Sequence, residues 1–289
     1  MLDISNIPSQ NQQTFTFYAT GNWQTWSKPR NAKFIQIFCL GAGGGGGQNN
    51  LSNPTGAGGG GSSGIVRGII PAFLLPDTIY ILVGKGGVGS SIVGAGGSGG
   101  NSYVAIQPST SEQTLICKAA TGTFSGGGGG TNAPGAAGLI SNVALSAYGN
   151  LGLFTAVAGV AGAAVSVNGT AGNSLTALAS NIITGGASGA GRNASITGVS
   201  GGSILAAPSI LTTNVSGGTA ASLNGESGYG RLQPFCGTGG GGGASVTTGV
   251  GGRGGNGWYG CGGGAAGGGT VLTKAGDGGD GLVIITVIT

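Results

Sequence analysis

Glycine is the residue that most limits what this chain can fold into, because it fills 72 of the 289 positions. Ordinary proteins contain roughly 7% glycine, and a glycine inside an α-helix costs about 0.8–1 kcal/mol relative to alanine. An α-helical fold is therefore excluded for most of the chain. A collagen triple helix is excluded as well, because glycine does not recur strictly at every third position and there are only 9 prolines.

The charge content argues against disorder and against several functions. Hydrophobic residues make up 39% of the chain and charged residues only 6%, whereas disordered chains combine low hydrophobicity with high charge. The 10 basic residues are too sparse for a nucleic-acid surface, so we expect no nucleic-acid partner. Histidine is absent from the sequence, and no serine has a recognisable catalytic partner, so we expect neither an enzyme nor a cofactor.

Alternating and β-branched stretches predict strands near the two ends of the chain. These stretches are residues 14–19, 33–40, 78–83, 102–106, 114–119 and 282–288. Because two isolated strands would be marginally stable, we expect the last strand to complete a sheet that the first one begins.

One glycine tract, residues 251–264, has a period of three. Glycine occupies one edge at positions 251, 254, 257, 260 and 263, and a second edge carries Arg253, Asn256 and Tyr259. Three residues per turn is the geometry of a polyproline-II-like helix, which has no internal hydrogen bonds. The sequence therefore predicts a body of polyglycine II helices packed side by side, on a base of N- and C-terminal strands, with little or no α-helix.

Composition divides the chain into four parts. We expect an N-terminal attachment segment with base strands in 1–40, a glycine-rich and β body in 41–130, an uncharged Ala/Ser/Thr-rich insertion with loops in 131–236, and a glycine-rich tract with a closing strand in 237–289. Within the insertion, residues 151–167 are apolar enough to consider a short membrane span. They lack flanking Lys or Arg, which favours burial between glycine layers or subunits.

Few side chains could carry chemistry. The cysteines are widely spaced and are expected to be buried free thiols: Cys39, Cys117, Cys236 and Cys261. Asp277 and Asp280 are the one close pair of acidic residues. We expect them to lie on a solvated edge or to accept backbone N–H groups at the entry to the last strand. A weak metal site is the alternative, although two carboxylates fall short of the six to eight oxygens that Ca²⁺ usually takes.

The aromatic residues supply the candidates for binding. Arg253, Trp258 and Tyr259 lie together in a glycine tract, and Trp, Tyr and Arg dominate binding hot spots. Packing against a neighbouring tract is the alternative for them. The remaining receptor-binding candidates are Tyr148, Phe154 and Tyr229, whereas Trp23 and Trp26 are expected to pack in the core or base.

Several motifs resemble the glycine-rich domain of bacteriophage tail-fibre and related virion proteins. They are FTFYATGNWQTWSKPRNAKFIQIFCLGAGGGGG, LLPDTIYILVGKGGVG, NSYVAI, TLICKAATG and GDGGDGLVIITVI. The resemblance covers about residues 14–130 and 237–289. It implies packed polyglycine helices, commonly at the distal end of a fibre, with intervening loops that contact the host surface.

The resemblance leads to an expected function and location. We expect a non-enzymatic phage virion protein, a tail-fibre tip or adhesin; a purely structural fibre or decoration protein of the head or tail, or a membrane-active component, are the alternatives. Expected partners are other virion proteins, contacted through the N-terminal strands, and a host cell-surface glycan or protein. A homo-oligomer is expected, with a trimer favoured, in an extracellular particle whose proteins are synthesised in the host cytoplasm.

Overall fold

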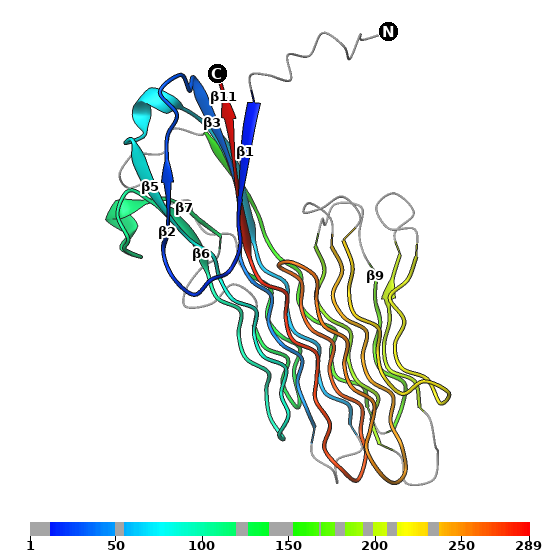
Figure 1. Ribbon diagram of the computed structural model, residues 1–289. Helices are drawn as coiled ribbons and strands as arrows, with labels where there is room; N and C mark the ends of the chain where they lie inside the picture. Colours follow the sequence, from blue (N-terminus) through cyan, green and yellow to red (C-terminus); the bar gives the residue numbers. More distant parts are fainter. Residues whose placement is uncertain are drawn as a thin grey trace, which may run out of the picture.

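The computed structural model describes residues 12–49, 55–119, 127–138, 153–167, 169–176, 183–192, 199–206, 213–230 and 237–289. It consists of a β-sandwich and a bundle of extended glycine-rich segments that projects from one end of the sandwich (Figure 1). The described residues contain no α-helix, only two 3₁₀ turns, η3 (Ala72–Leu74) and η4 (Glu112–Thr114). The predicted fold class, mainly β and irregular, is confirmed.

One face of the sandwich is a five-stranded antiparallel sheet. Its strands, in spatial order, are β1 (Gln12–Phe17), β11 (Leu282–Ile288), β3 (Phe34–Leu40), β4 (Ile65–Pro71) and β8 (Phe154–Val157). The last strand therefore lies between the first and the third, and it completes the sheet that the first one begins, as the sequence predicts.

The other face is a four-stranded antiparallel sheet. Its strands are β2 (Gln24–Ser27), β5 (Thr78–Leu82), β6 (Ser102–Ala105) and β7 (Leu115–Ala119). Side chains that alternate inward from both sheets form the core: Trp26, Ile35, Ile37, Ile70, Ile79, Ile81, Val104, Ile116, Val283 and Ile285. A further short parallel pair, β9 (Leu175–Thr176) and β10 (Ile204–Leu205), lies within the bundle part.

Sequence patterns missed β2, β4 and β8. β2 reads QTWS and has only one buried side chain, so it shows no apolar run. Gly68 interrupts β4, and it is required there because a Cβ at this position would lie 2.6 Å from the Phe154 ring of β8. A glycine in the middle of a strand weakens the strand pattern. The glycine that allows β4 to contact β8 therefore also prevented the prediction of β4.

The bundle is a lattice of polyglycine II segments held together by backbone hydrogen bonds. Along the central segment 41–49, successive N–H groups point to three neighbouring segments in turn, and every third one returns to the same neighbour. The bonds run from Gly43 to Gly279 and Gly46 to Gly276, from Gly44 to Gly61 and Gly47 to Gly58, and from Gly45 to Gly97 and Gln48 to Gly94. Its carbonyl groups accept N–H groups from three other segments, those that contain Gly87, Gly129 and Gly263. The predicted polyglycine II body is therefore observed.

Neighbouring segments approach so closely that no side chain fits between them. A Cβ on Gly46 would lie 2.1 Å from the Gly264 carbonyl oxygen, and a Cβ on Gly240 would lie 1.8 Å from that of Gly255. Both distances are far below van der Waals contact. The glycine content thus follows from the distance between segments rather than from a need for unusual backbone angles.

The three-residue period over 251–264 does not correspond to a single helix. The chain turns back at Trp258–Gly260, where Gly260 adopts a φ of 69°. The two halves lie antiparallel, with hydrogen bonds from Gly264 N to Gly255 O and from Gly267 N to Gly252 O. The spacing of three continues across the turn by coincidence, so the period alone could not locate it.

The described parts of 131–236 also contribute segments to the lattice. For example, Ala187 and Ala190 donate to the Gly240 and Gly243 carbonyls. Within the stretch considered as a membrane span, β8 is followed by an extended segment whose Ala163 is buried. Among the described residues, no helix has the length and apolar character needed to cross a membrane.

We predict that Gly46→Ala lowers the unfolding free energy by about 4 kcal/mol or more, because its methyl group must separate the central segment from Gly264. The control is Gly97→Ala on the exposed side of the lattice, where the nearest atom to a Cβ is Val88 N at 3.1 Å; we expect about 1 kcal/mol or less. Denaturant unfolding measures both. Equal losses would contradict the role of close approach.

Candidate functional site

One outer surface of the bundle presents two rows of polar and aromatic side chains. The rows belong to two parallel segments, 253–260 and 274–280. Hydrogen bonds from Gly254 N to Lys274 O, Gly257 N to Asp277 O and Gly260 N to Asp280 O fix the segments in register. Because a polyglycine II helix rises about 3.1 Å per residue, every third side chain recurs about 9 Å along the row. We call this surface the polar face; its residues are Arg253, Asn256, Tyr259, Lys274, Asp277 and Asp280.

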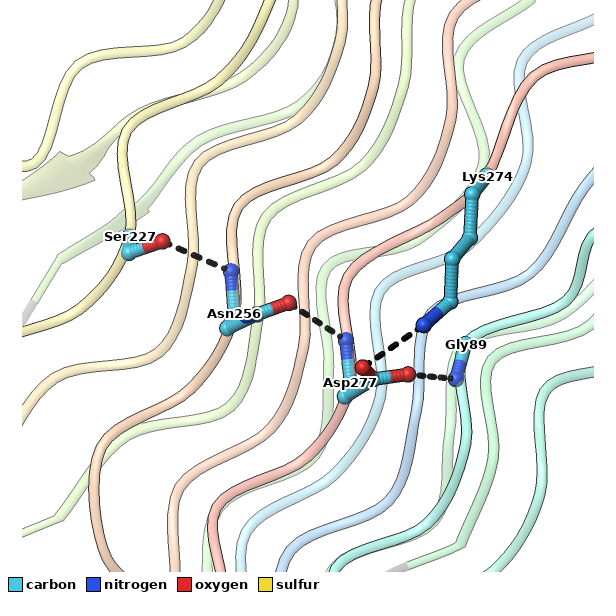
Figure 2. Close-up of polar contacts among 5 residues, drawn as sticks. All are labelled: Gly89, Ser227, Asn256, Lys274 and Asp277. Carbon is cyan, nitrogen blue, oxygen red and sulfur yellow. Dashed lines mark hydrogen bonds and ion pairs between the residues drawn. The ribbon is translucent and has the colours of Figure 1, made fainter.

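A chain of polar contacts crosses the middle of the polar face (Figure 2). Ser227 Oγ accepts the Asn256 N–H at 3.2 Å, and Asn256 Oδ1 accepts the Asp277 N–H at 2.9 Å. Asp277 Oδ1 then accepts the Gly89 N–H at 2.7 Å, while Asp277 Oδ2 pairs with Lys274 Nζ at 2.7 Å. A segment at the surface of the lattice lacks a neighbour on its outer side that could supply a backbone carbonyl. Ser227 Oγ, Asn256 Oδ1 and Asp277 Oδ1 accept the backbone N–H groups in its place.

On either side of this chain of contacts, other side-chain oxygens also accept backbone N–H groups. Asn224 Oδ1 accepts the Arg253 N–H at 2.9 Å, and Asp280 Oδ1 accepts the Gly86 N–H at 2.7 Å. The prediction that Asp277 and Asp280 accept backbone N–H groups is confirmed. The two carboxylates turn to separate N–H groups, and the described residues hold no group of three or more candidate metal ligands.

Tyrosine side chains lie at the sandwich end of the polar face. The Tyr259 ring lies 6.2 Å from the Tyr18 ring, at 40°, and 5.3 Å from the Trp258 ring, edge to face. Burial raises the pKa of the Tyr259 hydroxyl, and neighbouring Tyr18 and Asp280 raise it further. Tyr18 follows β1 and is 53% exposed. Sequence reasoning did not select Tyr18, because its partner Tyr259 lies at the other end of the chain.

Trp258 has a packing role. A Cβ on Gly230 would lie 2.2 Å from Trp258 Nε1, so the indole rests on this glycine. Trp258 also packs against the cluster that contains Phe38 and Cys261. Tyr259 packs against the same cluster and is likewise half-buried. Of the aromatic pair that the sequence singled out, Tyr259 is the one whose ring lies next to the exposed Tyr18 ring.

The other aromatic candidates do not join the polar face. Phe154 packs against the sandwich core from β8. Tyr229 donates its hydroxyl to the Thr213 carbonyl at 2.6 Å and packs beside the cluster of Ile204 and Val215. Tyr148 lies outside the described residues. Trp26 is buried as expected, and half-buried Trp23 lies 6.3 Å from the Tyr103 ring.

The thiols belong to the interior. Cys39, Cys117 and Cys261 are buried, as predicted, and Cys236 lies outside the described residues. A hydrogen bond with Cys39, together with burial, raises the pKa of the Cys117 thiol. A thiol with a raised pKa forms little of the reactive thiolate at neutral pH, so Cys117 is a core residue rather than a nucleophile; Cys39 and Cys261 also lie in buried apolar clusters.

The end of the bundle away from the sandwich consists of turns, which we call the distal tips (Figure 1). The described tips are residues 90–94, 131–134, 219–222, 247–250 and 269–273, and none of them contains a charged residue. They expose Ile92, at 68%, and Val271, at 50%, together with Val93 and Val250. A bridge between Val250 and Val271 joins two of the tips.

A two-sheet sandwich that carries a polyglycine II lattice defines a glycine-rich structural domain. A family model described as a glycine-rich domain matches residues 18–287, and the chain belongs to this family. The match confirms the glycine-rich part of the resemblance and includes the stretch 131–236 that the motifs left out. No curated protein matches the sequence.

We predict that Asp277→Ala lowers the unfolding free energy by about 1–3 kcal/mol, because the Gly89 N–H loses its acceptor and Lys274 loses its partner. Asp277→Asn keeps an acceptor oxygen for Gly89 and loses only the half-exposed ion pair, so its loss should stay below about 1 kcal/mol. Chemical unfolding of both variants measures the difference. If Asp277→Asn were as destabilising as Asp277→Ala, the acceptor role would be refuted.

Proposed function

We propose that this protein is a bacteriophage virion component, a tail-fibre tip or adhesin that attaches the particle to the host surface. The observation that carries the proposal is the set of distal tips, which contain no charged residue of their own and expose Ile92 and Val271. Among the described residues, the charged contact at the tips comes from Arg192, which donates to the Thr247 carbonyl at 3.2 Å. Exposed apolar side chains gathered at one place mark surfaces that bind a partner. The proposed role needs neither catalysis nor a cofactor.

The construction of the bundle supports this role. Each tip joins two lattice segments, whose backbone hydrogen bonds hold them at fixed positions. Turns on a rigid scaffold can differ in sequence without loss of the fold, and binding residues are disproportionately found on such loops. A rigid body whose tips tolerate sequence change suits a protein that meets a cell surface outside the cell.

The sandwich end is the proposed contact with other virion proteins. β1 begins and β11 ends at the side of the sandwich away from the tips (Figure 1). Phe34 and Ile69 are half exposed on the outer face of the five-stranded sheet, where a neighbouring protein would cover them. A symmetric homo-oligomer, with a trimer favoured, accompanies this proposal; light scattering at monomer mass would refute it.

The decisive experiment is binding of the labelled, folded protein to intact cells of candidate bacterial hosts, with competition against phage adsorption. Saturable binding that competes with adsorption is the expected result. Absence of binding by the folded protein to cells that adsorb the phage would favour the second candidate function, a purely structural virion part.

Substitutions in the distal tips test whether the tips make the contact with the cell. We predict that Ile92→Asp combined with Val271→Asp weakens cell binding at least about tenfold, because two desolvated apolar contacts are replaced by charges. The matched control is Phe73→Asp, a residue 83% exposed on η3 at the sandwich end, which should bind as the wild type does. Equal binding by all three proteins would rule out the distal tips as the contact surface.

A further inference from the structure

We propose that the polar face binds a neutral, linear glycan, with Tyr18 and Tyr259 as the stacking platform and Arg253, Asn256 and Asp280 as hydrogen-bonding partners. The inference goes beyond the proposed function, on which it rests, by assigning a second binding surface with its own ligand class. It places this ligand along the side of the bundle, separate from the distal tips.

The aromatic platform is the first support. Only 6% of the chain is aromatic, yet Tyr18 is 53% exposed and lies 6.2 Å from the Tyr259 ring. The two rings are tilted by 40°; half-buried Tyr259 is fixed by packing against the cluster that contains Phe38 and Cys261, and Tyr18 is the exposed member of the pair. Ring faces carry partial negative charge and attract the positively polarised C–H edges of a sugar ring.

The polar groups left over by the lattice are the second support. Asp277 is fully engaged, since Oδ1 accepts the Gly89 N–H and Oδ2 pairs with Lys274. Asp280 uses only Oδ1, to hold the Gly86 N–H, and within the described part of the chain its Oδ2 accepts no hydrogen bond. The Asp280 carbonyl accepts the N–H of Gly260, the residue after Tyr259, at 2.8 Å, so Asp280 lies in the segment next to the platform.

Arg253 is the corresponding donor. Its backbone N–H is held by Asn224, but its exposed guanidinium has no hydrogen bond or ion pair with the rest of the described chain. Arginine and carboxylate groups offer paired donors or acceptors in fixed planar geometry. Adjacent hydroxyl groups on a sugar ring present a matching pair.

The length and charge of the polar face select the class of ligand. Arg253 and Tyr259 lie two turns apart on one edge, or about 19 Å at 3.1 Å per residue, which spans several sugar rings. The two cationic side chains, Arg253 and Lys274, balance the two anionic ones, Asp277 and Asp280. A balanced surface favours a neutral ligand over a polyanion.

The test titrates the intact protein with neutral linear oligosaccharides, namely maltoheptaose, cellohexaose and chitohexaose, and with delipidated surface polysaccharide from a strain to which the protein adsorbs. Binding is followed by saturation-transfer NMR and by intrinsic fluorescence. We predict that Tyr18→Ala weakens binding about tenfold and that Arg253→Ala weakens it several-fold. Phe73→Ala, the exposed aromatic control on the sandwich, should leave binding unchanged.

Two results would overturn the glycan site: no binding to any of these probes by the folded protein, or equal binding by the Tyr18→Ala, Arg253→Ala and Phe73→Ala variants. A cell-surface protein as the ligand would appear as cell binding without polysaccharide binding, which also overturns it. Failure of the adhesin role is distinguishable, because the protein would then bind glycan through Tyr18 without competing with phage adsorption.

Discussion

The backbone hydrogen bond between neighbouring extended segments is the interaction on which the whole molecule depends. A polyglycine II segment has no internal hydrogen bonds, so each N–H and C=O is satisfied only when other segments surround it. In water, each such bond contributes only about 1 kcal/mol net, while ordering a glycine costs more than ordering any other residue. The lattice is therefore stable only as a large assembly. The sandwich supports it by fixing where segments begin and return.

The same requirement explains the chemistry of the surface. Where a segment lies at the outside of the lattice, Asn, Ser or Asp side chains replace the missing carbonyl, as Asn256 does for the Asp277 N–H. Such residues are first of all structural. Groups that this capping leaves unused, such as the Arg253 guanidinium and the second oxygen of Asp280, are the ones available to a ligand. Asp280 lies in the segment next to Tyr259, and Arg253 lies two turns away from Tyr259 along the same edge.

Local patterns predicted the parts of the structure whose cause is local. The strand at 282–288 could be predicted because its apolar, β-branched run is unbroken, and the three-residue period predicted the polyglycine helices. The turn inside 251–264 could not, because its residues keep the same spacing. Likewise, Asp277 could be assigned as a backbone acceptor, but the pairing of Tyr18 with Tyr259 depends on two segments at opposite ends of the chain. Such pairing has no signal in either local sequence.

The position of the segment 41–49 has a consequence for biogenesis. This early segment occupies the middle of the lattice, yet it donates hydrogen bonds to Gly276 and Gly279 near the end of the chain. During synthesis, its glycines therefore lack these partners until the segment that contains Gly276 and Gly279 has been made. Long-range contacts of this kind slow folding and leave incomplete chains prone to association. The lattice around 41–49 therefore closes only once this distant segment is present, so the middle of the bundle forms late although its own sequence comes early.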